Sequence, residues 1–103
     1  MTFTIENFDG EFRFAKMNAI EALALRTIIN FDDFDMSVKM IDTILEKIEV
    51  NCGSDWLPVK EKAHNVYYPV GIENNVFAIN ELVEKFLNDY LKPLFTKSSA
   101  SNQ

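Results

Sequence analysis

The length, composition and charge of this chain exclude several classes of protein. Its 103 residues, 48% hydrophobic and 25% charged, have the balance of one ordinary globular domain and not of a disordered chain. The formal net charge of −6 argues against direct binding of nucleic acid, which relies on cationic patches.

The sequence also predicts a protein of the cytoplasm that makes no contact with a membrane. No stretch approaches the ~20 uninterrupted apolar residues of a membrane-spanning helix, and the start of the chain lacks the pattern of a signal peptide. Cys52 is the only cysteine, so no disulfide can form within the chain, which fits a reducing compartment.

Residues 2–16 have the pattern of a β-hairpin. Phe3 and Ile5 alternate with polar residues, as do Phe12 and Phe14, and an Asp-Gly turn signal lies between the two runs. Two strands alone are marginally stable, so we expect the phenylalanine face to pack on other elements.

A first helix is predicted from Asn18 to near Asn30. Glu21 stands three residues after Asn18, which is a variant of the capping box at a helix N-terminus. The apolar stripe of this helix consists of Ile20, Leu23, Ala24, Thr27 and Ile28.

A second helix is predicted from about Asp35 to Glu49. Asp35, Ser37 and Asp33 are alternative caps for its first turn. Its apolar residues recur at helical spacing and are Val38, Ile41, Ile44, Leu45 and Ile48.

Residues 50–74 are less regular. The stretch from Trp56 should be extended, because Pro58 disfavours helix at the residue before it. Residues 66–70 suggest another extended piece, which Pro69 interrupts. Pairing of these pieces with each other or with the hairpin is left open.

The clearest prediction is a C-terminal helix with a wide apolar stripe, made of Ile79, Leu82, Val83, Phe86, Leu87, Tyr90 and Leu91. Asn75 or Asn80 could cap this helix, and Pro93 should end or kink it, because proline lacks a backbone donor and clashes with the preceding turn. Residues 96–103 should form a flexible polar tail after a single globular domain of residues 1–95. We therefore expect an α+β fold, mainly helical, in which the N-terminal β-hairpin packs on about three amphipathic helices.

No residue pattern predicts catalysis, a metal or a cofactor. His64 is the only histidine, and no local signature joins it to Cys52 as a nucleophile–base pair. Asp32, Asp33 and Asp35 do not form a calcium loop, because Asp33, Asp35 and Ser37 are followed by Val38 where the loop needs a glycine. The three glycines do not form a phosphate-binding loop. The sequence therefore favours a protein that binds other proteins over an enzyme.

Aromatic residues in the predicted loops are candidates for a partner-binding surface, since exposed aromatic patches usually mark contact sites. These candidates are Phe31, Phe34, Trp56, Tyr67 and Tyr68. Leu94 and Phe95, which follow Pro93, join them and are also candidates for contacts between copies of the chain.

Four segments give the chain a resemblance to the small tail assembly chaperones of long-tailed bacteriophages, in particular phages of Gram-positive hosts. One is the aromatic stretch and helix start at residues 12–19, and another is the end of the middle helix at residues 44–50. The others are Trp56-Leu57-Pro58-Val59-Lys60 with a following Tyr-Pro, and the C-terminal helix running into residues 93–99.

The resemblance implies a non-enzymatic role in the host cytoplasm during virion assembly. Such proteins are thought to coat the long helical tape measure protein and to help tail tube subunits assemble around it. Many also exist in a longer, frameshifted form, for which residues 96–103 would suit the junction. The family has no catalytic residues to carry over.

Other readings remain open beside this one. An acidic inhibitor of a host nuclease or other defence protein, which mimics the charge of nucleic acid, is the main alternative and is compatible with the net charge of −6. A regulatory adaptor is a further alternative, and an enzyme is the least favoured.

Overall fold

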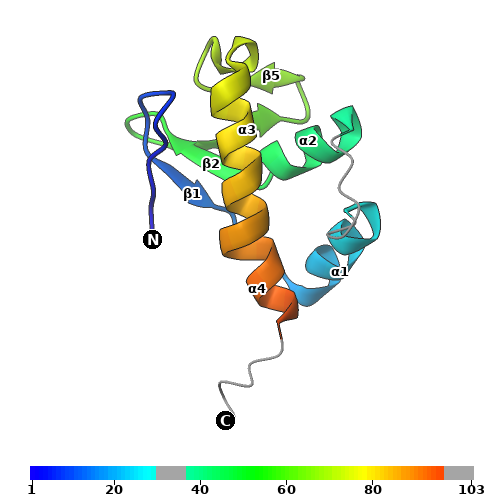
Figure 1. Ribbon diagram of the computed structural model, residues 1–103. Helices are drawn as coiled ribbons and strands as arrows, with labels where there is room; N and C mark the ends of the chain where they lie inside the picture. The colour runs from blue at the N-terminus through cyan, green and yellow to red at the C-terminus, as the bar shows by residue number, and fades with distance from the viewer. Residues whose placement is uncertain (30–36, 97–103) are drawn as a thin grey trace.

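The computed structural model describes residues 1–29 and 37–96 and has an α+β fold, 46% helical, with a small sheet (Figure 1). One long helical rod runs through the molecule and is made of α3 (Val76–Lys85), η2 (Phe86–Leu91) and α4 (Lys92–Phe95). In the view of Figure 1 the strands β1 and β2 lie to the left of this rod, and α1 (Ala19–Ile28) and α2 (Val38–Leu45) lie to its right.

The main sheet has three antiparallel strands in the order β1-β2-β3, which are β1 (Phe12–Phe14), β2 (Ile48–Asn51) and β3 (Trp56–Pro58). Phe12 pairs with Val50, and both side chains are buried. Arg13 pairs with Glu49 on the opposite face, where Nε and Oε1 lie 2.6 Å apart. The alternation of apolar and charged residues therefore orients the sheet with one face towards the core.

The N-terminal segment folds back along β1 through one backbone pair. The N–H of Phe3 donates to the Phe12 carbonyl and the N–H of Phe12 donates to the Phe3 carbonyl, both at 2.8 Å. The two runs of the expected hairpin thus meet at this pair, and β1 makes its longer ladder with β2. The turn of the segment is held on α3, because the Glu81 carboxylate accepts the N–H groups of Glu6 and Asn7 at 2.9 and 3.1 Å.

The face that α1 turns towards the core is narrow. Ala22 and Leu25 are buried within the helix, and Ile29 is buried just after it. The apolar stripe noted in the sequence lies on another side, where Ile20 is 78% and Leu23 is 54% exposed. This helix therefore presents apolar side chains to solvent.

The second helix is shorter than predicted. It begins after Ser37, whose side chain caps the first turn, and it ends at Leu45, so the prediction of helix up to Glu49 was wrong. After a turn the chain continues as β2, the central strand between β1 and β3. The side chains of Ile48 and Val50 on this strand are buried. Ile48 fits both the helical stripe and the strand alternation, and pairing on both sides decides for the strand.

Both extended pieces predicted between residues 50 and 74 are strands. The first is β3, and the second pairs with a short neighbour to form a separate two-stranded sheet of β4 (Lys60–Glu61) and β5 (Val66–Tyr67). The Tyr68–Pro69 peptide bond is cis, and a short 3-10 turn, η1 (Ile72–Asn74), then leads into α3.

The C-terminal helix was predicted correctly in its position and in its buried face. Asn75 caps it, with its side chain accepting the N–H of Ala78 at 3.0 Å. The predicted stripe provides a large part of the core, since five of its members are buried: Leu82, Val83, Phe86, Leu87 and Leu91. None of the helices in the described part of the chain is long and apolar enough to cross a membrane.

Pro93 does not end this helix. The preceding segment η2 is π-helical, and the N–H of Lys92 bonds to the carbonyl of Leu87, five residues back. In a regular α-helix the proline ring would collide with the carbonyl four residues before it, and the wider π turn accommodates the ring. The rod therefore continues and carries Leu94 and Phe95 to its end.

Candidate functional site

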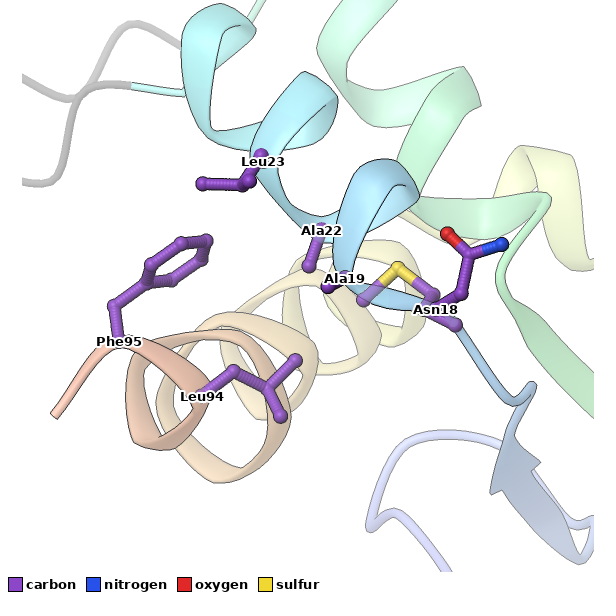
Figure 2. Close-up of a pocket in the computed structure, with 7 residues that line it drawn as sticks. Asn18, Ala19, Ala22, Leu23, Leu94 and Phe95 are labelled. Atoms are coloured by element: carbon purple, nitrogen blue, oxygen red, sulfur yellow. The ribbon is translucent and has the colours of Figure 1, made fainter. Parts of the chain in front are cut away.

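An apolar groove of about 440 Å³ lies between the start of α1 and the end of the rod. It is lined by Met17, Asn18, Ala19, Ala22, Leu23, Leu94 and Phe95, and we call it the α1–α4 groove. Figure 2 shows Leu94 and Phe95 on one side and Leu23, Ala22 and Ala19 of α1 on the other. Leu23 and Leu94 are 54% and 51% exposed, so the groove is open to a partner.

The first wall of the groove is fixed by the capping box at the start of α1. The Asn18 side chain accepts the N–H of Glu21 at 2.8 Å, and the Glu21 carboxylate accepts the N–H of Asn18 at 3.0 Å. The same carboxylate lies 3.0 Å from Nζ of Lys47. These contacts, the Asn18 backbone first and Lys47 second, lower the pKa of Glu21. The carboxylate is therefore ionised at neutral pH and holds the helix start in place.

Tyr90 ties this wall to the rod. Its hydroxyl donates to the carbonyl of Ala15 at 2.8 Å and accepts the N–H of Met17 at 3.1 Å. Its ring stacks on Phe14 with a centroid distance of 4.9 Å. Tyr90 of η2 thus bonds both to the carbonyl of Ala15 and to the N–H of Met17, in the segment just before α1. These two hydrogen bonds fix the distance between the two walls of the groove.

The second wall carries a contact across the groove. Cζ of Arg26, in the last turn of α1, lies 4.7 Å from the centroid of the Phe95 ring. A guanidinium over an aromatic face is attracted by the ring quadrupole. Arg26 thus holds Phe95 as part of the groove wall.

Among the candidate residues that the structure describes, Leu94 and Phe95 lie in the groove. Phe31 and Phe34 lie outside the described residues. Trp56 is half-buried on β3, with Cζ of Arg13 4.3 Å from its ring centroid.

Tyr67 and Tyr68 lie elsewhere in the fold. Both are partly buried and pack against the core. The Tyr67 hydroxyl donates to Oδ1 of Asp42 at 2.8 Å, and the same ring lines a smaller hollow of about 140 Å³ between α2, β5 and α3. Burial first, and then the bond to Asp42, raises the pKa of Tyr67, so it remains a neutral donor. The Tyr67 hydroxyl is therefore already used in a hydrogen bond within this chain.

Lys60 is a buried charged residue beside this hollow. Its Nζ lies 3.2 Å from Oδ2 of Asp42 and 5.3 Å from the centroid of the Tyr67 ring. Burial by itself lowers the pKa of Lys60. The hydrogen bond and the charge of Asp42 raise the pKa by more than this, so the pKa of Lys60 lies above its ordinary value. The cluster of Asp42, Lys60 and Tyr67 therefore joins α2 to the second sheet as a structural contact.

His64 and Cys52 both lie on the surface of the described part of the chain. His64 is exposed, and its Nδ1 lies 2.7 Å from Oε1 of Glu61 in the same turn. This contact, led by the His64 backbone N–H, lowers the pKa of Glu61. Cys52 is exposed in the loop after β2, and no group of acids, histidines or cysteines among the described residues could hold a metal ion.

Comparisons with protein-family models, curated proteins and solved structures found no match to this chain. The groove therefore has to be understood from its own residues. Sequence reasoning missed Met17, Ala19 and Ala22 as groove residues, because they become a wall only when the rod lies beside them. A signal for Leu23 was present, since it belongs to the α1 stripe that the core does not use.

Proposed function

We propose that this protein is a non-enzymatic assembly chaperone that holds an amphipathic helix of a partner protein in the α1–α4 groove. The resemblance noted in the sequence suggests the partner, a tape measure protein around which tail tube subunits assemble in the cytoplasm of an infected cell. The observation that carries the proposal is the half-exposed pair Leu23 and Leu94 on the two walls of one apolar groove.

The physical properties of the groove support this proposal. Burying apolar surface stabilises a complex by roughly 25 cal/mol per Å², and an amphipathic helix supplies anchors at i, i+3, i+4 and i+7 for such a groove. Ala19 and Ala22 have short side chains, so a partner's apolar side chain can enter between the walls. Many weakly bound copies along one long rod would gain avidity without tight individual contacts.

The test is co-migration with a long helical protein encoded beside this one. We expect the variants Leu23→Ser and Leu94→Ser to lose co-migration in size-exclusion chromatography, because each puts a hydroxyl in the apolar groove. Phe77→Ser is the matched control, since Phe77 is 68% exposed on α3 and does not line the groove. Wild-type binding by both groove variants would rule out the α1–α4 groove as the binding surface.

We also propose Phe31, Phe34 and Trp56 as partner-binding residues, on the grounds given by the sequence. If they contact the partner, Phe31→Ala, Phe34→Ala and Trp56→Ala should weaken binding while the circular dichroism spectrum stays unchanged. Unchanged binding by all three would leave the groove as the proposed surface. Leu94 and Phe95 are also where we propose that copies of the chain would touch.

The alternative of an acidic nuclease inhibitor is less well supported. A mimic of nucleic acid needs carboxylates that face a basic partner. Several described carboxylates instead accept hydrogen bonds from this chain, as Glu11 does from Thr2 and Asn51 at 3.0 Å each, and as Glu81 does from the N-terminal turn. Inhibition of a nuclease that fades steeply with salt would favour this alternative.

A further inference from the structure

The helical rod changes its winding just before Pro93. One row of completely buried side chains follows steps of four, from Ala78 to Leu82 and Phe86, and then continues at Leu91 after a step of five. This longer step coincides with the π-helical segment η2. A π turn closes on the fifth residue instead of the fourth, so it takes up one residue more than an α turn.

The proline gives a physical reason for the wider turn at this place. In a regular α-helix residue 93 would donate to the carbonyl of Asp89, but proline has no N–H and its ring clashes with that carbonyl. The N–H of Lys92 bonds instead to the carbonyl of Leu87, five residues back. Pro93 then stands in the first turn of α4, where proline is tolerated. It therefore disfavours the regular α-helix that the preceding residues would otherwise continue.

The extra residue sets the direction in which the end of the rod faces. Successive residues of an α-helix lie about 100° apart around its axis. In a regular helix continued from Phe86, residue 93 would take the angular position that Leu94 holds, and Leu94 would take that of Phe95. With the π turn in place, Leu94 and Phe95 lie across the groove from α1 (Figure 2).

The same turn decides the place of Tyr90. In the regular helix Tyr90 would take the core position that Leu91 holds, and Leu91 is completely buried. With the π turn, the Tyr90 hydroxyl instead bonds to the carbonyl of Ala15 and the N–H of Met17. One winding change therefore orients both the apolar end of the rod and the side chain that ties the rod to α1.

We infer that Pro93 is the positioning residue of the α1–α4 groove, because it keeps the π turn that points Leu94 and Phe95 towards α1. Pro93 is not among the residues that line the groove, so it acts through these two neighbours. The inference rests on the proposed function for the use of the groove and adds the residue that gives the groove its shape.

Replacing the proline tests whether it sets the rotation. In Pro93→Ala the restored N–H can bond to the Asp89 carbonyl, and the rod can wind as a regular α-helix. The guanidinium of Arg26 lies 4.7 Å over the Phe95 ring, so its NMR resonances should be shifted upfield by the ring current. We expect Pro93→Ala to lose this upfield shift. Pro58→Ala is the control, since it removes a proline from β3, outside the rod, and should keep the shift.

A deletion should restore the wild-type rotation without the proline. Asn88 is exposed on η2, so its removal takes no side chain from the core. Deleting Asn88 from Pro93→Ala removes the one residue that the π turn takes up, and a regular α-helix then returns Leu94 to its wild-type direction. The upfield shift of Arg26 should return with it. Such a rescue separates rotation from a general effect of proline on stability, and thermal midpoints show whether each variant is folded.

Peptide binding measures the consequence for the proposed function. The probe is a synthetic helix of about 20 residues with leucines at i, i+3, i+4 and i+7. Pro93→Ala should bind this peptide about tenfold more weakly in fluorescence anisotropy, because the leucine of one wall no longer faces the groove. The variant that also lacks Asn88 should bind it as the wild type does.

The two measurements distinguish the possible failures. An unchanged Arg26 resonance in Pro93→Ala would overturn the inference, because the packing of Tyr90 and Leu91 would then hold the π turn by itself. A lost shift that deletion of Asn88 does not restore would overturn it as well, since the effect of the proline would not be one of rotation. If the wild type does not bind the peptide but the NMR shifts are as expected, the proposed function is contradicted and the positioning role of Pro93 stands.

Discussion

Asp42 is the residue that joins α2 to both strands of the second sheet. Its two carboxylate oxygens are used by different partners, Oδ1 by the Tyr67 hydroxyl and Oδ2 by the buried ammonium of Lys60. A buried cation that loses its partner stays desolvated without compensation, which is more costly than loss of the pair as a whole.

We therefore expect Asp42→Asn to destabilise the protein by about 2 kcal/mol in urea unfolding. Asp89→Asn is the control, because Asp89 forms an exposed pair with Lys85 and should change stability by no more than about 0.5 kcal/mol. Equal midpoints for the two variants would mean that Lys60 finds another way to be solvated. The double variant with Lys60→Met should recover part of the loss.

Glu81 makes the attachment of the N-terminal segment sensitive to acid. The N–H of Glu6 first, and the groups of Asn7 after it, lower the pKa of Glu81 below its ordinary value of 4.5. A carboxyl group whose pKa is lower in the folded state adds stability above the unfolded pKa. That stability is lost as the pH falls through the folded pKa.

Thermal midpoints measured from pH 7 to pH 3 test this role. The wild-type midpoint should fall below about pH 4.5, and Glu81→Gln should start lower at pH 7 and fall less on acidification. Glu84→Gln, exposed on the same helix, should keep the wild-type acid response. Parallel curves for Glu81→Gln and wild type would show that Glu81 contributes nothing to the acid response.

At the scale of elements, the start of the rod depends on one cap. Asn75 satisfies the N–H of Ala78 with its carbonyl oxygen and donates its amide to the Asn7 carbonyl at 2.9 Å. The Asn75 side chain therefore caps the start of α3 and attaches the N-terminal turn to it, whereas the alternative cap Asn80 is exposed inside α3.

Replacing each asparagine by alanine separates the two alternatives. Asn75→Ala should cost about 1 kcal/mol or more, because it removes a helix cap and an attachment of the N-terminal turn. Asn80→Ala should be neutral or slightly stabilising, since alanine has the higher helix propensity. Chemical denaturation of both variants measures the difference, and a greater loss for Asn80→Ala would contradict the observed cap.

At the scale of the whole molecule, the rod connects the core to the groove. Its middle part buries Leu82 and Phe86 completely, and its end carries the half-exposed Leu94. The same element thus provides stability at one part of its length and apolar surface at another. Partner binding at the end of the rod should therefore stabilise the entire fold by mass action.

A partner peptide at a hundred times its dissociation constant should raise the free energy of unfolding by about 2.7 kcal/mol. For a domain of this size, that increase corresponds to a rise of roughly 10 °C or more in the melting midpoint. Leu94→Ser should abolish the rise while the midpoint of the free protein changes little, because Leu94 is 51% exposed. A rise that survives in this variant would place the binding site elsewhere.

The sequence by itself determined the features that depend on neighbours three or four residues apart. The cap at Asn18 and the buried stripe of the rod follow from local donors, acceptors and helical spacing, whereas the choice between Asn75 and Asn80 as the second cap came from the structure. The strand at Trp56 could also be predicted, because Pro58 restricts the backbone before it, and the strand at Tyr67 could be predicted from the run of valine and tyrosine.

Only the tertiary structure decided the features that depend on residues far apart in the chain. Ile48 is in a strand and not in a helix because Phe14 of β1 pairs with it on one side and the N–H of Val59, just after β3, donates to its carbonyl on the other. The groove exists because the π turn lets the rod pass Pro93 and bring Leu94 beside Leu23, seventy-one positions earlier in the sequence. Local spacing shows that α1 carries an apolar stripe, but only the packing of α1 through Leu25 decides that this stripe stays exposed.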